Sequence, residues 1–85
     1  SNIVLSTNRY LNDMERLTVF PNPAKNTLLV QSINKIKNIK VYNLLGALVI
    51  ETNKKNVGIN HLVNSIYFFK IQTETGIKTI KIIKK

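Results

Sequence analysis

The side chains that could carry out chemistry are few in this chain of 85 residues. General acid–base catalysis needs two groups held together, and nucleophilic catalysis needs an activated serine, cysteine or lysine beside a base. The one histidine, His61, has no acidic residue near it in the sequence, and there is no cysteine to join it in a metal site. The acidic residues are scattered: Asp13, Glu15, Glu51 and Glu74. We therefore predict that the chain is not an enzyme and has no catalytic residues, metal site or cofactor.

Lysine is the dominant charged residue. Thirteen lysines and arginines outnumber four acidic residues, which gives a formal net charge of +9 and raises the question of a polyanionic partner such as nucleic acid, anionic lipid or acidic polysaccharide. Aromatic residues such as Tyr42 and Phe68 could stack on bases, but they lie within apolar strand patterns, and no nucleic-acid-binding motif is present. We favour the interpretation that scattered lysines solubilise a small β domain and protect its edges, without a nucleic-acid partner.

From Leu17 onward the sequence predicts an all-β domain. Short runs rich in Ile, Val, Leu, Phe and Tyr recur roughly every ten residues, a rhythm typical of a sandwich or barrel. Residues 1–16 are polar and lack a sustained period, so we interpret them as a linker or N-terminal tail that precedes one domain over residues 17–85. No apolar run approaches the roughly 18 residues of a membrane span. The predicted strands cover residues 17–20, 27–32, 37–43, 47–52, 56–60, 66–73 and 77–84.

Two four-residue segments predict hairpins: NLLG at residues 43–46 and TETG at residues 73–76. Each has a side-chain acceptor first and glycine fourth, which suits a type I turn followed by a left-handed residue at a bulge. The Asn43 side chain can accept from the backbone two residues on, while Gly46 and Gly76 can take a positive φ without a Cβ penalty. The third strand should therefore pair with the fourth, and the sixth with the seventh.

Both prolines lie in the stretch FPNPAKN. Pro21 and Pro23 lack backbone N–H donors and hold φ near −65°, so the first strand must end at Phe20 or run along an edge. Pro23 suits the second position of a type I turn over residues 22–25, which the side chain of Asn22 would close. We interpret the stretch as a rigid corner between the first two strands. A surface epitope recognised by a partner is the alternative.

The last two predicted strands carry much of the apolar sequence. The sixth, SIYFFKIQ, is apolar on both faces and should be central or covered by a partner. In the seventh, Ile80 and Ile82 share one side with Lys78 and Lys84, so this strand is either an edge guarded by lysine or one left available for a partner. The predicted core consists of Val19, Leu28, Val30, Ile39, Val41, Val49, Ile59, Leu62, Tyr67, Phe69 and Ile71.

Three stretches, FPNPAKNTLLV, IKVYNLLGALV and INHLVNSIYFFKIQTETGIKTIKIIKK, together resemble the type A C-terminal sorting domains of type IX secretion cargo in Bacteroidetes-type bacteria. Those domains open with an aromatic-Pro-Asn-Pro-Ala corner and continue through an Ile-Tyr-Asn-x-x-Gly hairpin. They close with Gly-Ile-Tyr, a hairpin through glycine and a lysine-ended strand. The resemblance covers about residues 17–85. It marks as motif and recognition residues Phe20, Pro21, Asn22, Pro23, Tyr42, Asn43, Gly46, Tyr67, Gly76, Lys84 and Lys85.

The resemblance implies an immunoglobulin-like antiparallel β-sandwich of about seven strands that acts as a non-catalytic secretion signal. Its partners would be an attached N-terminal cargo, the outer-membrane type IX machinery and a sortase-like peptidase that usually removes the domain. The protein would pass through the periplasm and then be secreted or held at the cell surface. The alternatives are an adhesion or carbohydrate-binding sandwich and, less favoured, a basic nucleic-acid-binding domain.

The chain departs from the family pattern before Ile66-Tyr67. It has Asn64-Ser65 where those domains usually have glycine. Asparagine tolerates the left-handed conformation better than other non-glycine residues, so we expect Asn64 to adopt it with the loop shifted by one position. A positive φ at Ser65 instead would add about 1–2 kcal/mol of strain. The terminal lysines, Lys84 and Lys85, are expected to be exposed.

Overall fold

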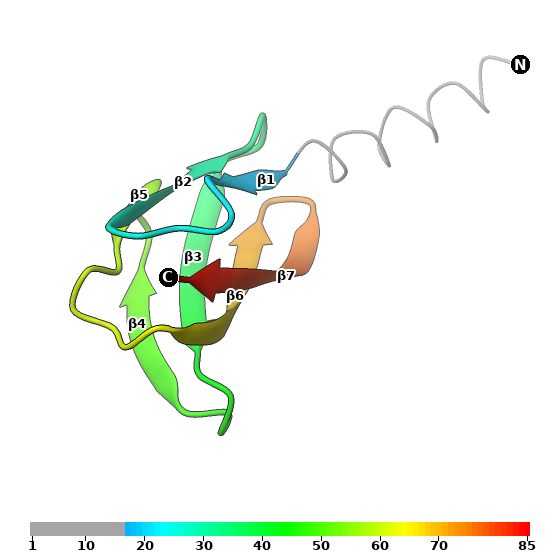
Figure 1. Ribbon diagram of the computed structural model, residues 1–85. Coiled ribbons are helices and arrows are strands. Elements are labelled where there is room, and N and C mark those ends of the chain that lie inside the picture. The colour runs from blue at the N-terminus through cyan, green and yellow to red at the C-terminus, as the bar shows by residue number, and fades with distance from the viewer. Residues whose placement is uncertain (1–16) are drawn as a thin grey trace, which may run out of the picture.

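The computed structural model describes residues 17–85, and all regular structure within them is β-strand (Figure 1). Every predicted strand is present, with its ends shifted by no more than two residues. The largest shift is at the fifth strand, which ends two residues early. The strands are β1 (Thr18–Phe20), β2 (Thr27–Gln31), β3 (Ile36–Tyr42), β4 (Leu48–Thr52), β5 (Asn56–Gly58), β6 (Ser65–Thr73) and β7 (Gly76–Lys84).

The strands form two antiparallel sheets. One has three strands in the order β1-β2-β5, and the other has four in the order β4-β3-β6-β7. Figure 1 shows the three-stranded sheet lying across one face of the four-stranded sheet. This arrangement confirms the prediction of an immunoglobulin-like antiparallel sandwich. The two predicted hairpins, β3 with β4 and β6 with β7, are also confirmed, and β6 is an interior strand as its two apolar faces indicated.

The core lies between the two sheets, where inward-facing apolar residues of both meet. Most of the predicted core residues are buried; Val49 and Leu62 are half-buried and pack against the core. The buried apolar residues that the prediction missed are Leu17, Ala24, Ile36, Val57 and Ile82. Ala24 and Ile82 were missed because neither belongs to a clean alternation. Ala24 is a small residue in the proline stretch, and Ile82 lies among lysines.

The two hairpin turns differ in backbone conformation. At the first, the Asn43 Oδ1 accepts from the backbone N–H groups of Leu45 and Ala47, both at 3.0 Å, and Gly46 has a φ of 83°. The register shifts between Val41 and the next residue, as expected for a bulge. At the second, Gly76 has a φ of 156° and pairs directly with the residue before the turn. The left-handed glycine is therefore confirmed at the first turn, whereas the second has a nearly extended glycine.

The loop before β6 contains no left-handed residue. Among residues 17–85, positive φ values occur only at glycines. The expectation that Asn64 or Ser65 adopts this conformation is therefore wrong, and the associated strain is absent. Ser65 instead begins β6, opposite Lys84 of β7. The side chain of Asn64 accepts a hydrogen bond from the Lys84 Nζ at 3.2 Å. The loop is thus held by a side-chain contact to the last strand.

Candidate recognition surfaces

The proline corner is bound to the last strand. The Asn22 Oδ1 accepts from the backbone N–H of Ile83, and its Nδ2 donates to the carbonyl of Lys81, both at 3.1 Å. The predicted turn that this side chain would close is therefore wrong: residues 21–23 form a bend, and Asn22 points to a strand about sixty positions away. Both peptide bonds that precede Pro21 and Pro23 are cis.

Ala24 extends this contact through its backbone. Its N–H donates to the carbonyl of Ile83 at 2.8 Å, and its carbonyl accepts from the N–H of Lys85 at 2.8 Å, which makes a parallel bridge opposite Lys84. The Ala24 side chain is buried. In Figure 1 the cyan corner between β1 and β2 runs beside the C-terminal end of β7. The corner thus acts as a short additional strand at the edge of the four-stranded sheet.

The corner protects part of the free edge of β7. In the antiparallel pair with β6, alternate residues of β7 direct their backbone groups away from the sheet. The outward groups at Lys81, Ile83 and Lys85 are those bonded by Asn22 and Ala24. The sequence left two alternatives for this edge, lysine protection or availability to a partner. The structure shows that its C-terminal part is covered by the chain itself.

The lysines of β7 have different environments. Lys78 and Lys84 flank the buried Ile82 on the inner side of the strand, and both are half-buried. The Lys78 Nζ donates to the carbonyl of Leu17 at 3.2 Å, while Lys84 holds the loop before β6. Their aliphatic stems cover the edge of the core while the ammonium groups reach its rim. The expectation of exposure is wrong for Lys84 and confirmed for Lys85.

An apolar hollow of about 390 Å³ lies at the end of the sandwich formed by the β3–β4 turn and the loop before β6. Two of its side chains are strongly exposed: Leu45 at 93% and Val63 at 74%. We call this region, residues 43–48 with residues 61–65, the tip. The hollow has room for an apolar side chain of another molecule and has no charged lysine or acidic group in its wall. It is lined by Asn43, Leu44, Leu45, Val49, His61, Leu62, Val63, Ser65 and Tyr67.

Tyr67 supports the tip from inside. Its side chain is 3% exposed, and its hydroxyl donates to the carbonyl of Val63 at 2.6 Å. The ring therefore belongs to the core, while the hydroxyl fixes the loop that forms one wall of the hollow. Asn43 and Gly46 fix the opposite wall through the turn described above. Asn43, Gly46 and Tyr67 thus build the tip.

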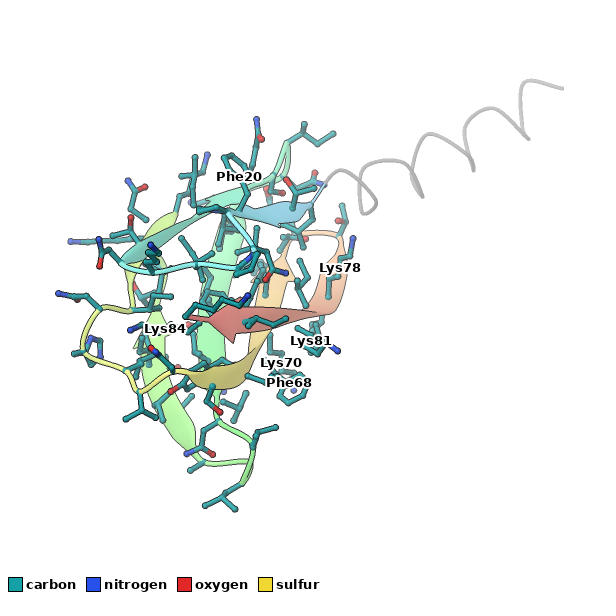
Figure 2. The ribbon with its side chains drawn as sticks, viewed as in Figure 1. Phe20, Phe68, Lys70, Lys78, Lys81 and Lys84 are labelled. Atoms are coloured by element: carbon teal, nitrogen blue, oxygen red, sulfur yellow. The ribbon has the colours of Figure 1, made fainter. Side chains whose placement is uncertain are left out.

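The structure groups the predicted motif residues into separate regions. The corner lies with Lys84 and Lys85 at the edge of β7, whereas Phe20 lies on β1 in the other sheet and is 42% exposed (Figure 2). Asn43, Gly46 and Tyr67 gather at the tip, with Tyr42 half-buried beside them on the outer side of β3. Gly76 lies at the far end of β6 from Tyr67. The sequence did not indicate the first grouping, because its members lie at opposite ends of the domain.

Within residues 17–85, no helix is long and apolar enough to cross a membrane. In the same range, no group of three or more His, Cys, Asp or Glu side chains is placed to hold a metal ion. His61 is exposed in the wall of the hollow, as expected for a loop histidine.

Comparison with known proteins identifies the family. No match is found among curated proteins. Residues 18–85 match the model of a family described as the secretion system C-terminal sorting domain. The matched region contains the proline corner, both hairpins and the lysine-ended strand, and so includes every motif that carried the resemblance. Because the match extends over most of the chain, this protein belongs to the family of type IX secretion C-terminal sorting domains.

Proposed function

We propose that this domain directs an attached cargo protein across the outer membrane through the type IX machinery, and that the machinery recognises it as a folded surface. Family membership makes the domain a secretion signal and the protein that carries it secreted or surface-exposed. The family is non-catalytic, which supports the expectation that the domain is not an enzyme. Transit through the periplasm and removal by a sortase-like peptidase are further parts of the proposal.

The proposal rests on the hydrogen-bonded contact between the proline corner and the last strand. Asn22 and Ala24 make four hydrogen bonds to residues 81–85, so the first and last motifs of the matched region form one structural unit. These motifs are adjacent only in the folded chain. A partner that contacts them together would therefore distinguish a folded domain from an unfolded one.

The segment of residues 1–16 has a separate role in this proposal. We propose that it links the cargo to the sorting domain of residues 17–85, and that the sortase-like peptidase cleaves within or upstream of it. Its polar sequence suits an accessible linker, since proteolysis concentrates in exposed segments of that kind. The partners are then the cargo on one side and the outer-membrane machinery with its peptidase on the other.

The experiment attaches the full chain to a folded reporter that carries its own N-terminal export signal, in a bacterium with a type IX system. The wild-type fusion should deliver the reporter outside the cell. The test variant is Ile39→Asp, which places a charge in the core but leaves every motif residue unchanged. It should leave intact reporter in the periplasm, whereas the surface control Lys54→Glu should be exported normally. Normal export of the unfolded Ile39→Asp variant would show that the signal is a linear peptide and contradict the proposal.

A further inference from the structure

The four-stranded sheet has a second face, turned away from β1, β2 and β5, that combines lysines with apolar side chains. On β6, Tyr67, Phe69 and Ile71 point into the core, so the alternate residues point outward. Figure 2 shows Phe68, Lys70 and Lys81 together on this side of β6 and β7. We call this surface the outer face and define it by Lys40, Ile66, Phe68, Lys70, Lys81 and Ile83.

The lysines of the outer face are close to one another. Lys40 of β3 and Lys70 of β6 are directly opposite in the register. The Cβ atoms of such pairs lie about 5 Å apart, and like charges placed in this way are destabilising. Lys81 is opposite Phe68, so it adds a third ammonium group to the same surface. None of the three donates a hydrogen bond to residues 17–85. The described residues thus leave most of this positive charge without a negative partner, which points to a negatively charged ligand.

A shallow hollow of about 80 Å³ lies between the opposed lysines and is lined by Asn38, Lys40, Lys70, Gln72 and Ile77. Its ammonium and amide groups can donate hydrogen bonds to a carboxylate. The carboxylate of Glu51, opposite Lys40 on β4, already accepts a hydrogen bond from the Asn38 Nδ2 at 3.1 Å. One glutamate thus balances only one of the three lysines, and the hollow keeps an excess of positive charge.

Apolar side chains adjoin this charge. Ile66 and Ile83 are opposite each other and half-buried, as is Phe68, and Ile77 is 54% exposed. A nucleic acid or acidic polysaccharide would gain little binding free energy by covering isoleucine side chains. Binding of single strands uses several aromatic rings, whereas the outer face offers Phe68 and, next to it on β3, Tyr42, both half-buried. A protein segment that carries both carboxylates and apolar side chains matches both parts of the surface.

We propose that the outer face binds an acidic, partly apolar segment of a partner protein, with a carboxylate in the hollow between Lys40 and Lys70 and an apolar side chain on Phe68. The inference rests on the proposed function, because the partner is then a protein that the domain meets during export. Complementary charge speeds encounter and fixes orientation more than it adds affinity. Binding should therefore weaken as the salt concentration rises.

The first test uses the exported fusion. The face variant replaces Lys40, Lys70 and Lys81 by Gln. The control replaces Lys35, Lys54 and Lys55 by Gln; these lysines are exposed in loops outside the corner and give the same change in net charge. The face variant should lower export by about tenfold or more, and the control by less than about twofold. Equal export of the wild type and both variants would overturn this inference alone. Failure of the wild-type fusion to be exported would overturn the proposed function.

The second test measures binding to the purified full chain. The probe is a soluble synthetic peptide rich in glutamate and leucine, with oligothymidine and heparin as comparison ligands. The face variant should weaken peptide binding by about tenfold, and the lysine control should not. If oligothymidine or heparin binds as tightly as the peptide and loses as much in the face variant, the surface is a general polyanion site. That result would overturn the choice of a protein partner.

The third test separates binding from folding. Replacement of Lys70 by Gln removes the repulsion from Lys40, so the Tm of the purified chain should stay constant or rise. Peptide binding and export should nevertheless fall. A clear drop in Tm would show that Lys70 supports the fold, and would overturn the argument that its position serves a ligand.

Discussion

The edge of β7 and the tip use their side chains in opposite ways. At the edge, both polar atoms of Asn22 are bonded to the last strand, and the backbone of Ala24 completes the cover. At the tip, the Asn43 Oδ1 and the Tyr67 hydroxyl are hydrogen-bonded inside the domain, but Leu45 and Val63 are left exposed around a hollow. The C-terminal part of the β7 edge is therefore covered by the chain itself, whereas the tip leaves apolar side chains exposed.

The difference teaches that a motif residue need not be a contact residue. Asn22, Asn43 and Tyr67 all belong to the sorting-domain motifs, and the Asn22 Oδ1, the Asn43 Oδ1 and the Tyr67 hydroxyl are all hydrogen-bonded to the chain itself. Their replacement should change export mainly by changing the fold. The residues available to a partner include exposed motif residues such as Pro21 and residues outside the motifs, such as Leu45 at the tip and Lys70 on the outer face. The predictions below separate these two classes.

The largest effect is expected from deletion of residues 78–85. It removes most of β7, uncovers Phe69 and Tyr67, and takes away the strand on which the corner rests. The loss should exceed the total stability of a small domain, which is roughly 5–15 kcal/mol. Circular dichroism should show an unfolded chain with no cooperative melting, and export should cease. A folded truncated domain would contradict the view that the edge is integral to the sandwich.

A moderate effect is expected from Asn22→Ala. The variant loses two hydrogen bonds of 3.1 Å to β7, and because the side chain is exposed, water replaces part of their contribution. The cost should be about 1 kcal/mol, which lowers Tm by about 4–8 °C in a domain of this size. The control is Asn53→Ala, at an exposed loop position that makes no side-chain hydrogen bond to residues 17–85, and its Tm should not change. Equal melting of the two variants would mean that the corner does not stabilise β7.

A smaller effect distinguishes the adjacent terminal lysines. Lys84→Gln loses the hydrogen bond to Asn64 and some cover of the core rim, and should cost about 0.5–1 kcal/mol. Lys85→Gln changes an exposed side chain and should stay within about 0.5 kcal/mol of the wild type. Chemical denaturation of both variants tests this difference. If Lys85→Gln proves the more destabilising, the side-chain contact of Lys84 is not what holds the loop before β6.

The sequence predicted the strands and sheets well because their information is local. Alternation of apolar residues located every strand, and Asn43 with Gly46 predicted the first hairpin down to its left-handed glycine. The corner was predicted only in part, since proline restricts the backbone but does not specify the long-range partner of Asn22. The burial of Ile82 and the anchoring role of Lys84 were missed for the same reason. The burial of Ile82 and the contact of Lys84 with Asn64 both depend on which other segments of the chain pack against β7.

The grouping of the candidate surfaces could not be predicted without the sheet order. Lys40 and Lys70 are thirty positions apart, and only the pairing of β3 with β6 places them opposite each other. Seen one strand at a time, they are ordinary lysines that alternate with apolar residues. The interpretation of the lysines as scattered was made without this pairing of strands. The tip was missed in a similar way, because its walls come from two loops on either side of β4 and β5.

The smallest effect on stability is expected from Leu45→Ser at the tip. The side chain is 93% exposed, so its removal sacrifices almost no buried apolar area, and the free energy of unfolding should change by less than about 0.5 kcal/mol. Ile33→Ser is the matched control, since Ile33 is an aliphatic residue, 57% exposed, in the loop before β3 at the opposite end of that strand. A clear drop in the Tm of Leu45→Ser would show that Leu45 packs into the hollow, so that the tip, like the edge of β7, is covered by the chain itself.

If both variants melt normally, their export distinguishes the tip from the rest of the surface. Reduced export of Leu45→Ser alone would place recognition at the exposed apolar surface of the tip. Equal export of both variants would exclude Leu45 from recognition and leave the edge and the outer face as the surfaces to be contacted.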